Sequence, residues 1–302
     1  MEPVELRPRR VGGILDVAFR VTRARFGDLA KAVAVIVVPV SVVSAVLLTL
    51  VTPPPDAFGR LSDPEFSDSV TSVEQMLAEI DGGAVALLFG VTVLGAFLGA
   101  LTAQLSTAAT FKIIARAYLG LPQDWRDSVG FAGRRFWPLI WLQLIYGVLL
   151  TLGFLALAVP GVYLAVAWTV AIPALMFENV RGHQALARSR ALLAGRWWST
   201  LGLVVLLAIL TGLVSTLITE MLLAVVPANG DLAEAVAGGL AGSVGSILTT
   251  PFAAVAVTVL FFDSLVRKEG FDELELADAM GVTGYRGLPG ESNGGKRLLE
   301  AD

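Results

Sequence analysis

The sequence predicts an all-α, polytopic membrane protein with six transmembrane helices. Of its 302 residues, 55% are hydrophobic and 16% are charged, and the mean hydropathy is +0.74. A water-soluble domain of this length needs more polar surface, so the excess apolar surface must face lipid. Uniform runs such as AVAVIVVPVSVVSAVLLTLV also have the ~20-residue length that crosses a bilayer core.

Six apolar stretches carry this prediction. The break between the third and the fourth is Pro160-Gly161, which predicts a tight hairpin. Pro39, Pro173 and Pro251 predict kinks inside the first, fourth and sixth stretches. The predicted spans are about 32–51, 84–105, 138–159, 162–177, 200–226 and 236–262.

The spans divide the chain into an N-terminal segment (1–31), a membrane domain (32–265, with a long outer loop 52–83) and a C-terminal tail (266–302). Within 10–31, Leu15, Phe19, Thr22 and Phe26 recur on one helical face, which predicts an amphipathic helix at the membrane interface. Packing of this helix on the end of the bundle is the alternative. The tail is first acidic and then Gly-rich and polar, which predicts a mostly disordered segment.

The basic residues are strongly segregated. All Lys and Arg except Arg60 lie in the N-terminal segment, the loops 106–137 and 178–199, or the C-terminal segment. The positive-inside rule therefore places both termini in the cytoplasm and requires an even number of spans. We expect a multi-pass protein of a bacterial plasma membrane. The outer loop 52–83 is acidic and predicts a short amphipathic helix on the outer surface, with a cation-attracting vestibule as the alternative.

Two spans carry a small residue at every fourth position, a spacing that permits close approach of helix backbones. We therefore expect the second and sixth spans to contact each other, with a homodimer face as the alternative. The small residues are Gly95, Gly99, Ala103 and Thr107 in the second span, and Gly238, Gly242, Ser246 and Thr250 in the sixth.

The chain also predicts a threefold internal repeat. Arg25-Phe26, Arg135-Phe136 and Arg196-Trp197 each stand between an interfacial segment and the first of two spans. The three units share one orientation, as parallel repeats about the membrane normal do. Convergence is the alternative, because basic segments entering a membrane commonly read Arg-aromatic-apolar.

Few residues offer chemistry. The absence of cysteine excludes disulfides and thiolate sites, and the single His183 excludes a histidine pair. We therefore expect no catalytic residue, no metal site and no cofactor. Four charged residues at the inner ends of the spans, Glu178, Arg188, Asp263 and Arg267, are predicted to form a cytoplasmic polar cluster that locks the three units together.

Three polar residues lie inside the predicted spans. Gln104 and Gln143 are predicted to bond across helices. Glu220 lies near the outer end of the fifth span, where it is expected to reach the interface; a proton or ion path is the alternative.

At these residues a resemblance to a family emerges. The run ALMFENVRGHQALARSRALLAGRWW resembles a pattern in the membrane domain associated with bacterial glycerophosphoryl diester phosphodiesterases and in related stand-alone actinobacterial membrane proteins. The segments LFFDSLVRKEGFDELELA and RPRRVGGILDVAFRVTRARF are similar to the end and the beginning of that domain, so the resemblance covers about 7–277. The pattern is carried here by Pro173, Glu178, Ala187, Arg188, Ser189, Gly195 and Trp197.

The resemblance implies a multi-spanning helical domain without an established activity of its own. In longer relatives the phosphodiesterase is a separate domain with a His-Arg-Gly motif and metal-binding carboxylates, and this chain matches neither. We therefore expect a non-enzymatic scaffold or accessory subunit, whose partners are the lipid bilayer and a membrane or cytoplasmic protein, and no nucleic acid. The alternative is a transporter, channel or lipid-translocating protein. A cavity lined by Glu220, Gln104 or Gln143 would favour transport, and a solid bundle would favour the scaffold.

Overall fold

A computed structural model of the chain describes residues 6–51, 82–178, 180, 182–225 and 231–282, and every regular element in these ranges is a helix. Residues 52–81 of the predicted outer loop, with the short helix expected there, and the last part of the tail lie outside the described residues. The helices are α1 (Val11–Val51), α5 (Gly82–Tyr118), α6 (Trp125–Gly133), α7 (Phe136–Ala156), α8 (Ala158–Ala167), α9 (Ala171–Glu178), α10 (Gly182–Leu193), α11 (Trp197–Leu223), α12 (Asp231–Glu269) and α13 (Glu273–Ala279).

The described chain contains six helices long and apolar enough to cross a membrane, which confirms the predicted fold class of an integral membrane protein. These helices match the six predicted spans in order, but the first begins at Val11 instead of 32 and the second ends at Tyr118 instead of 105; the other boundaries differ by at most seven residues. They are Val11–Leu47, Phe89–Tyr118, Phe136–Ala156, Ala158–Glu178, Trp197–Leu223 and Val236–Glu269.

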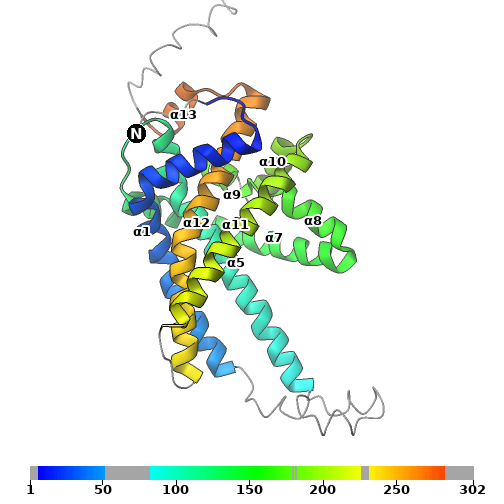
Figure 1. The fold of residues 1–302 in the computed structure, drawn as a ribbon. Coiled ribbons are helices and arrows are strands. Elements are labelled where there is room, and N and C mark those ends of the chain that lie inside the picture. Colours follow the sequence, from blue (N-terminus) through cyan, green and yellow to red (C-terminus); the bar gives the residue numbers. More distant parts are fainter. Residues whose placement is uncertain (1–5, 52–81, 179, 181, 226–230, 283–302) are drawn as a thin grey trace, which may run out of the picture.

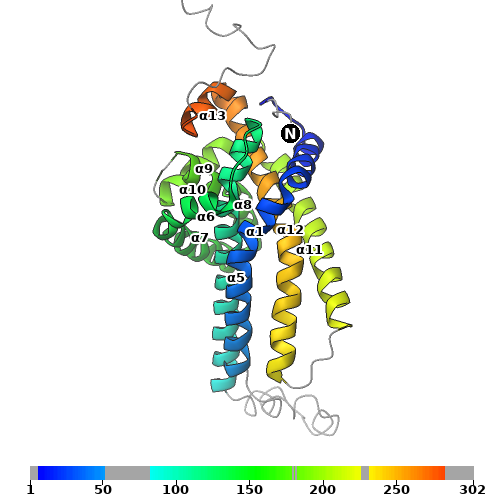
Figure 2. The same ribbon diagram turned by 90° about the vertical axis from the view of Figure 1, so that its left-hand side faces the viewer.

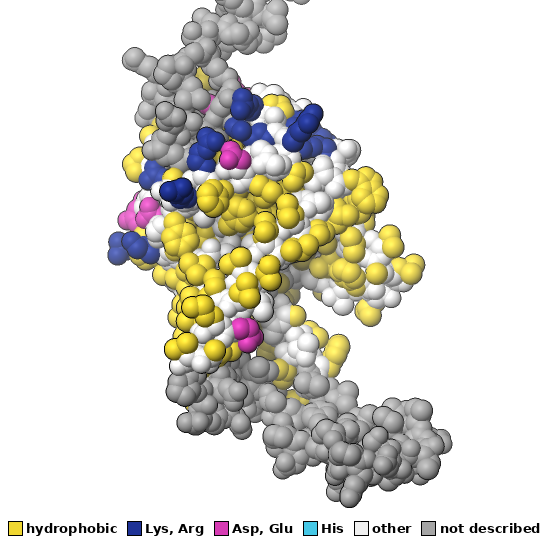
Figure 3. Space-filling view, viewed as in Figure 1, with side chains coloured by type: hydrophobic (Ala, Val, Ile, Leu, Met, Phe, Trp, Pro, Cys, Tyr) yellow, Lys and Arg dark blue, Asp and Glu magenta, His cyan; other side chains and the backbone are white. Residues whose placement is uncertain are grey.

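Four of the long helices, α1, α5, α11 and α12, run in one general direction, and they are the described elements of the lower half of the molecule (Figures 1 and 2). The remaining elements gather at the other end, around the N-terminus and α13. We call this end the head and define it as the first part of α1 (11–24) with α6, α9, α10 and α13. The Lys and Arg side chains visible in Figure 3 also gather at this end, above an apolar belt.

The α7–α8 hairpin projects sideways from the upper half and runs across the direction of the four long helices (Figure 1). Its tip is apolar and exposed: Leu155 is 77% exposed, Leu157 69% and Val159 76%. Such a surface requires a lipid environment. The predicted orientation holds whether or not this hairpin crosses the bilayer. Without its two spans the number of spans is still even, so both termini stay on the same side.

The turn of this hairpin differs from the prediction. The chain leaves the helix at Leu157, which is extended (φ −172°, ψ 147°), and Pro160 and Gly161 already lie in the first turn of α8. Proline is tolerated there because the first-turn amides need no partner within the helix. Gly161 is instead needed for packing, since a Cβ at this position would lie 2.6 Å from the Phe154 ring.

The helical backbone is interrupted near one of the three prolines at which kinks were predicted, and kinks at the other two stay predictions. Pro39 lies inside α1 and Pro251 inside α12, and both helices are continuous through these positions. The fourth span is broken before Pro173, between the end of α8 and the start of α9. The only non-helical backbone that α1 contains is at Arg25 (φ −121°, ψ 19°), where the first part of the helix turns away from the second (Figure 1).

The predicted interfacial helix packs on the bundle through one face and leaves another exposed. Ile14, Val17 and Val21 are fully buried, whereas Phe19 is 61% exposed and Phe26 37%. The exposed aromatic side chains are those of the predicted membrane-facing stripe. Contact of this stripe with lipid headgroups stays a prediction.

The beginning of the predicted disordered tail is folded. Helix α12 continues to Glu269, and α13 follows with Leu276 fully buried and Ala277 2% exposed. The apolar residues Phe271 and Leu276 explain the difference, because they pack on the core beside the acidic residues that suggested disorder. Residues 283–302 lie outside the described residues.

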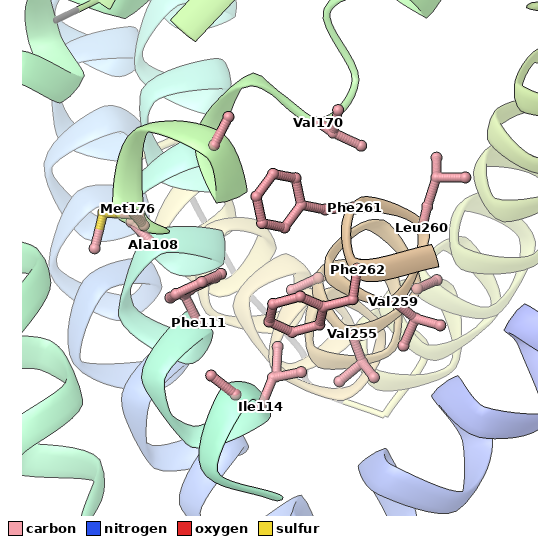
Figure 4. Close-up of a cluster of buried hydrophobic side chains, with 14 of the residues drawn as sticks. Ala108, Phe111, Ile114, Val170, Met176, Val255, Val259, Leu260, Phe261 and Phe262 are labelled. Atoms are coloured by element: carbon pink, nitrogen blue, oxygen red, sulfur yellow. The ribbon is translucent and has the colours of Figure 1, made fainter. Parts of the chain in front are cut away.

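One core joins the head to the ends of the long helices. Side chains from α5, α9 and α12 interdigitate in it, among them Phe111, Met176, Phe261 and Phe262 (Figure 4). All four are at most 1% exposed. This end of the molecule is therefore close-packed.

Candidate functional site

The four charged residues of the predicted polar cluster are distributed over two ion-pair centres. In the first, Arg188 Nε on α10 donates to both carboxylate oxygens of Glu178 on α9, at 2.7 and 2.8 Å. Its terminal nitrogens bond Glu269 at the end of α12, with a shortest contact of 2.6 Å. This guanidinium therefore joins three helices, and the Glu269 hydrogen bond is the largest cause that raises the pKa of Arg188.

The second centre is built around Asp263 on α12. This carboxylate is 3% exposed as a residue and accepts hydrogen bonds from the Arg9 backbone amide, Arg196 and Arg267, the last at 3.1 Å. Arg267 also donates to the Arg9 carbonyl at 2.8 Å. A buried carboxylate needs such donors, because burying an unpaired charge is costly.

Together the two centres join the segment that leads into the first predicted unit, through Arg9, with α9 of the second unit and the α10–α12 region of the third. Sequence reasoning missed three of their members, Arg9, Arg196 and Glu269. Arg196 had a signal of its own, as one of the three aligned arginines. Glu269 lies six residues after Asp263 and therefore on another face of α12. Its contact with Arg188 could not be predicted from i, i+4 spacing within one helix.

The polar residues inside the spans have different environments. Gln104 on α5 donates to the Gln143 side chain on α7, and both residues are at most 9% exposed. Gln143 also lines a largely apolar cavity of about 510 Å³ between α5 and α7. Glu220 is exposed near the end of α11 and lines none of the described cavities.

A second hollow lies between α1, α5 and α12, in the half of the molecule opposite the head. Two cavities of about 650 and 290 Å³ share Ser41, Ser44, Gly95 and Ser246 in their linings and so form one crevice. Its walls are lined mainly by apolar side chains, glycine and hydroxyl groups. We call this hollow the crevice; its other lining residues are Val37, Val40, Ala45, Leu47, Val91, Leu94, Leu98, Gly99, Thr102, Ala103, Ser106, Ser215, Gly238, Gly239, Gly242 and Thr250.

The crevice changes the meaning of the two small-residue stripes. A Cβ added at Gly95, Gly99, Gly238 or Gly242 would meet nothing within 4 Å, so these glycines do not bring α5 and α12 together. The two helices contact each other nearer the head, where Phe111 and Phe262 lie 6.1 Å apart. The expected contact between the second and sixth spans is therefore present, but it lies near the head, and the two stripes are walls of a hollow.

The residues of the resemblance pattern have clear structural roles around the first centre. Glu178 and Arg188 are its ion pair. Ser189 is fully buried, donates to the Ala167 carbonyl at 2.8 Å and accepts from the Val170 amide at 3.2 Å, which holds α10 against the break in the fourth span. Gly195 has φ +85°, a conformation that favours glycine. The motif therefore shapes the head.

The three aligned arginines share one backbone conformation. Arg25, Arg135 and Arg196 have φ of −121°, −106° and −124° and ψ of 19°, 16° and 21°, and each immediately precedes a long helical segment. A further threefold feature was missed in the sequence. Phe111, Phe177 and Phe262 contact one another, with ring centroids 6.4 Å apart for Phe111–Phe177 and 6.1 Å apart for the other two pairs. Phe177 and Phe262 end the second predicted spans of their units, and Phe111 lies on the same helix as the second span of the first unit, beyond its predicted end.

The comparisons with known proteins add one family. A family model described as Domain of unknown function (DUF8558) matches residues 136–289, slightly more than half of the chain. The matched region begins at α7 and includes Glu178, Arg188, Asp263 and Glu269 of the two ion-pair centres. No curated protein and no solved structure matches the chain.

Proposed function

Since the chain belongs to the family described as Domain of unknown function (DUF8558), we propose its function from its own geometry: it is a non-enzymatic accessory subunit or scaffold at the inner face of a bacterial plasma membrane. The observation that carries the proposal is the head. Two ion-pair centres and a close-packed core fix its helices to the ends of the membrane helices. Such a rigid platform suits the docking of a partner.

The orientation of the head belongs to the same proposal. The described Lys and Arg side chains gather at the end that carries the head (Figure 3), and the positive-inside rule places this end in the cytoplasm. The partner surface that we propose is the outer face of α10, where His183, Ala187 and Arg190 are exposed. The Arg190 guanidinium lies 6.0 Å from the centre of the Tyr163 ring, a cation–π contact between α10 and α8.

The test separates docking from folding. The tagged chain is purified gently from native membranes as wild type, Arg190→Glu, Arg188→Glu and, as a matched charge reversal on α6, Arg126→Glu. We expect the wild type and Arg126→Glu to retain a stoichiometric protein partner, and Arg190→Glu to lose it while its melting temperature is unchanged. Arg188→Glu should lose both the partner and stability, because it places an acid between Glu178 and Glu269.

A partner-free but well-folded wild type would overturn the proposal. Retention of the partner by Arg190→Glu at wild-type stoichiometry would instead remove α10 as the docking surface.

A second candidate function, lipid translocation or transport, is favoured by the hollows. Gln143 lines one of them, and the crevice has several hydroxyl groups in its walls. The described walls of the crevice carry no charged side chain, which weighs against an ion path. Purified protein in liposomes should accelerate neither dithionite quenching of a headgroup-labelled lipid nor solute release; acceleration of either would favour this candidate.

We also infer that the three units form a structural repeat about one axis. The shared conformation of Arg25, Arg135 and Arg196 supports it, as does the mutual contact of the three phenylalanines. The residues four positions after the arginines, Leu29, Leu139 and Thr200, are all at most 1% exposed and supply a third correspondence.

A further inference from the structure

The cavity that Gln143 lines lies where α5 and α7 separate. The two helices touch at the bond between Gln104 and Gln143, and from there α5 and the α7–α8 hairpin run in different directions (Figure 1). One turn beyond this bond, Ala100 and Gly147 line the cavity, and a Cβ added at Gly147 would meet nothing within 4 Å. This cavity of about 510 Å³ is therefore a wedge whose narrow end lies at the two glutamines, and we call it the wedge.

The narrow end of the wedge holds a hydrogen-bond donor without an acceptor. The Gln143 side-chain oxygen accepts from the Gln104 amide, but the Gln143 side-chain nitrogen makes no hydrogen bond within the described part of the chain. Gln143 is only 3% exposed. The Gln104 side-chain oxygen is fully enclosed, whereas the Gln143 nitrogen is not, so an occupant of the wedge can reach this donor. An amide left unpaired in apolar surroundings is costly, which points to a ligand with an acceptor.

The rest of the wedge selects against charge. The lining described for it contains no Asp, Glu, Lys or Arg. A carboxylate or phosphate beside the donor would therefore be buried without a counter-charge. Aromatic side chains line both walls, Phe97 on α5 and Tyr146 on α7, and a flat ring packs well against such side chains.

The wide end of the wedge is open to the membrane. Val93 on α5 and Val148 and Leu152 on α7 line it, and each is at least half exposed. An apolar surface of this kind requires a lipid environment. A hydrophobic ligand can therefore enter from the bilayer without any opening of the helix bundle.

From these observations we propose that the wedge binds a neutral lipid with a carbonyl-bearing ring, namely a prenylated quinone. The ring lies at the narrow end, where its carbonyl oxygen accepts from the Gln143 side-chain nitrogen, and the prenyl tail follows the apolar walls toward the bilayer. An acyl chain alone leaves the donor unpaired, and the ester carbonyls of a phospholipid bring a phosphate with them. The volume also lies within the range of about 300–1,000 Å³ that is usual for small-molecule sites. This inference goes beyond the proposed accessory function and needs no protein partner.

The experiment measures ligand binding to the purified full-length chain in lipid nanodiscs. The probes are a naphthoquinone with one prenyl group and the naphthalene with the same prenyl group, which lacks both carbonyls. Empty nanodiscs give the partition of each probe into lipid alone. The wild type should bind the quinone about tenfold more tightly than the naphthalene, because only the quinone accepts a hydrogen bond.

Two kinds of variant test the donor and the space separately. Gln104→Leu with Gln143→Leu removes the donor without leaving either amide unpaired, so the quinone should bind about tenfold more weakly and the naphthalene as before. Gly147→Leu, or Ala100→Leu on the opposite wall, fills the wedge and should abolish binding of both probes. Gly212→Leu on α11, where a Cβ also meets nothing, should bind both as the wild type does. Equal melting temperatures show that the variants fold.

Four outcomes overturn the proposal. They are no binding above that of empty nanodiscs, equal affinity of the wild type for the two probes, undiminished quinone binding by both filling variants, and displacement of the quinone by an equal concentration of diacylglycerol. The last would assign the wedge to an ester lipid. Failure of the accessory function is seen separately, by co-purification with a partner, because Arg190 does not line the wedge.

Discussion

At the scale of single residues, Asp263 joins parts of the chain that are far apart in sequence. Its carboxylate binds the segment before α1, the first residue before α11 and its own helix. Asp263→Ala would leave Arg196 and Arg267 without their counter-charge at a site where the acid is 3% exposed. We predict a loss of about 3–5 kcal/mol in the free energy of unfolding.

The matched control is the exposed pair of Asp16 and Arg20, whose side chains are 65% and 62% exposed. Asp16→Ala should cost less than about 0.5 kcal/mol, because exposed i, i+4 pairs contribute little. Unfolding in detergent, followed by tryptophan fluorescence, measures both variants. Equal stability of the two would show that the Asp263 contacts do not hold the head together.

Gly195 provides a second prediction at this scale. Its φ of +85° reverses the chain between α10 and α11, and an L-residue with a Cβ is strained there. Gly195→Ala should cost about 1–2 kcal/mol of stability. Gly202→Ala, at a helical position with open space around its Cβ, should be neutral or stabilising by up to about 1 kcal/mol. A neutral Gly195→Ala would contradict the structural role given to this motif residue.

At the scale of the elements, the α7–α8 hairpin is the most informative feature. Hydropathy predicts two spans here, yet the hairpin runs across the four long helices (Figure 1). Local sequence could predict two apolar helices with a break near Pro160. It could not predict their direction, which depends on the Gln104–Gln143 bond and on the packing of α7 and α10.

A cysteine at the tip of this hairpin would distinguish a hairpin that crosses the bilayer from one that lies along the membrane. If it crosses the bilayer, Leu157→Cys should react with a charged, membrane-impermeant maleimide from the outer side. If it lies along the membrane, the same cysteine should stay protected from both sides and react only with an apolar maleimide. We predict protection, because the residues around the tip are exposed and apolar.

Two other cysteines calibrate this labelling. Arg60→Cys reports the predicted outer side, and Pro122→Cys, at an exposed position before α6, reports the predicted inner side. Rapid labelling of Leu157→Cys at the rate of Arg60→Cys would show that the hairpin spans the membrane.

At the scale of the whole molecule, the number and order of the apolar helices could be predicted because each follows from a local property of the chain, the length of an apolar run. The contacts of the candidate site could be predicted where both partners are near in sequence, as Asp263 and Arg267 are within one helix and as Glu178 and Arg188 are on two successive helices. The roles of Arg9 and Glu269 depend on how distant helices meet. The stripes of small residues show the same limit on prediction from sequence. A small residue at every fourth position occurs both where two helices touch and where a helix lines an open crevice, so the pattern does not distinguish the two.

The three phenylalanines in the core that joins the head to the long helices permit a test of the proposed repeat. Phe111, Phe177 and Phe262 form a nearly equilateral triangle of rings, with centroid distances between 6.1 and 6.4 Å. Aromatic pairs contribute about 0.5–1.5 kcal/mol beyond the burial of their area. If the units are equivalent, the three pairwise coupling energies should be of similar size. Double-mutant cycles with leucine, measured by unfolding in detergent, give these energies.

The cycle of Phe111 with Phe154, an exposed residue of the hairpin with which it shares no ring contact, should show coupling near zero. One strong pair with two weak ones would mean that the triangle arises from unrelated packing. Three similar couplings would mean that the core of the head is organised about one axis, with the acidic residues next to Phe177 and Phe262, Glu178 and Asp263, as equivalent anchors. Lys112, which follows Phe111, would then be the position at which the first unit departs from the other two.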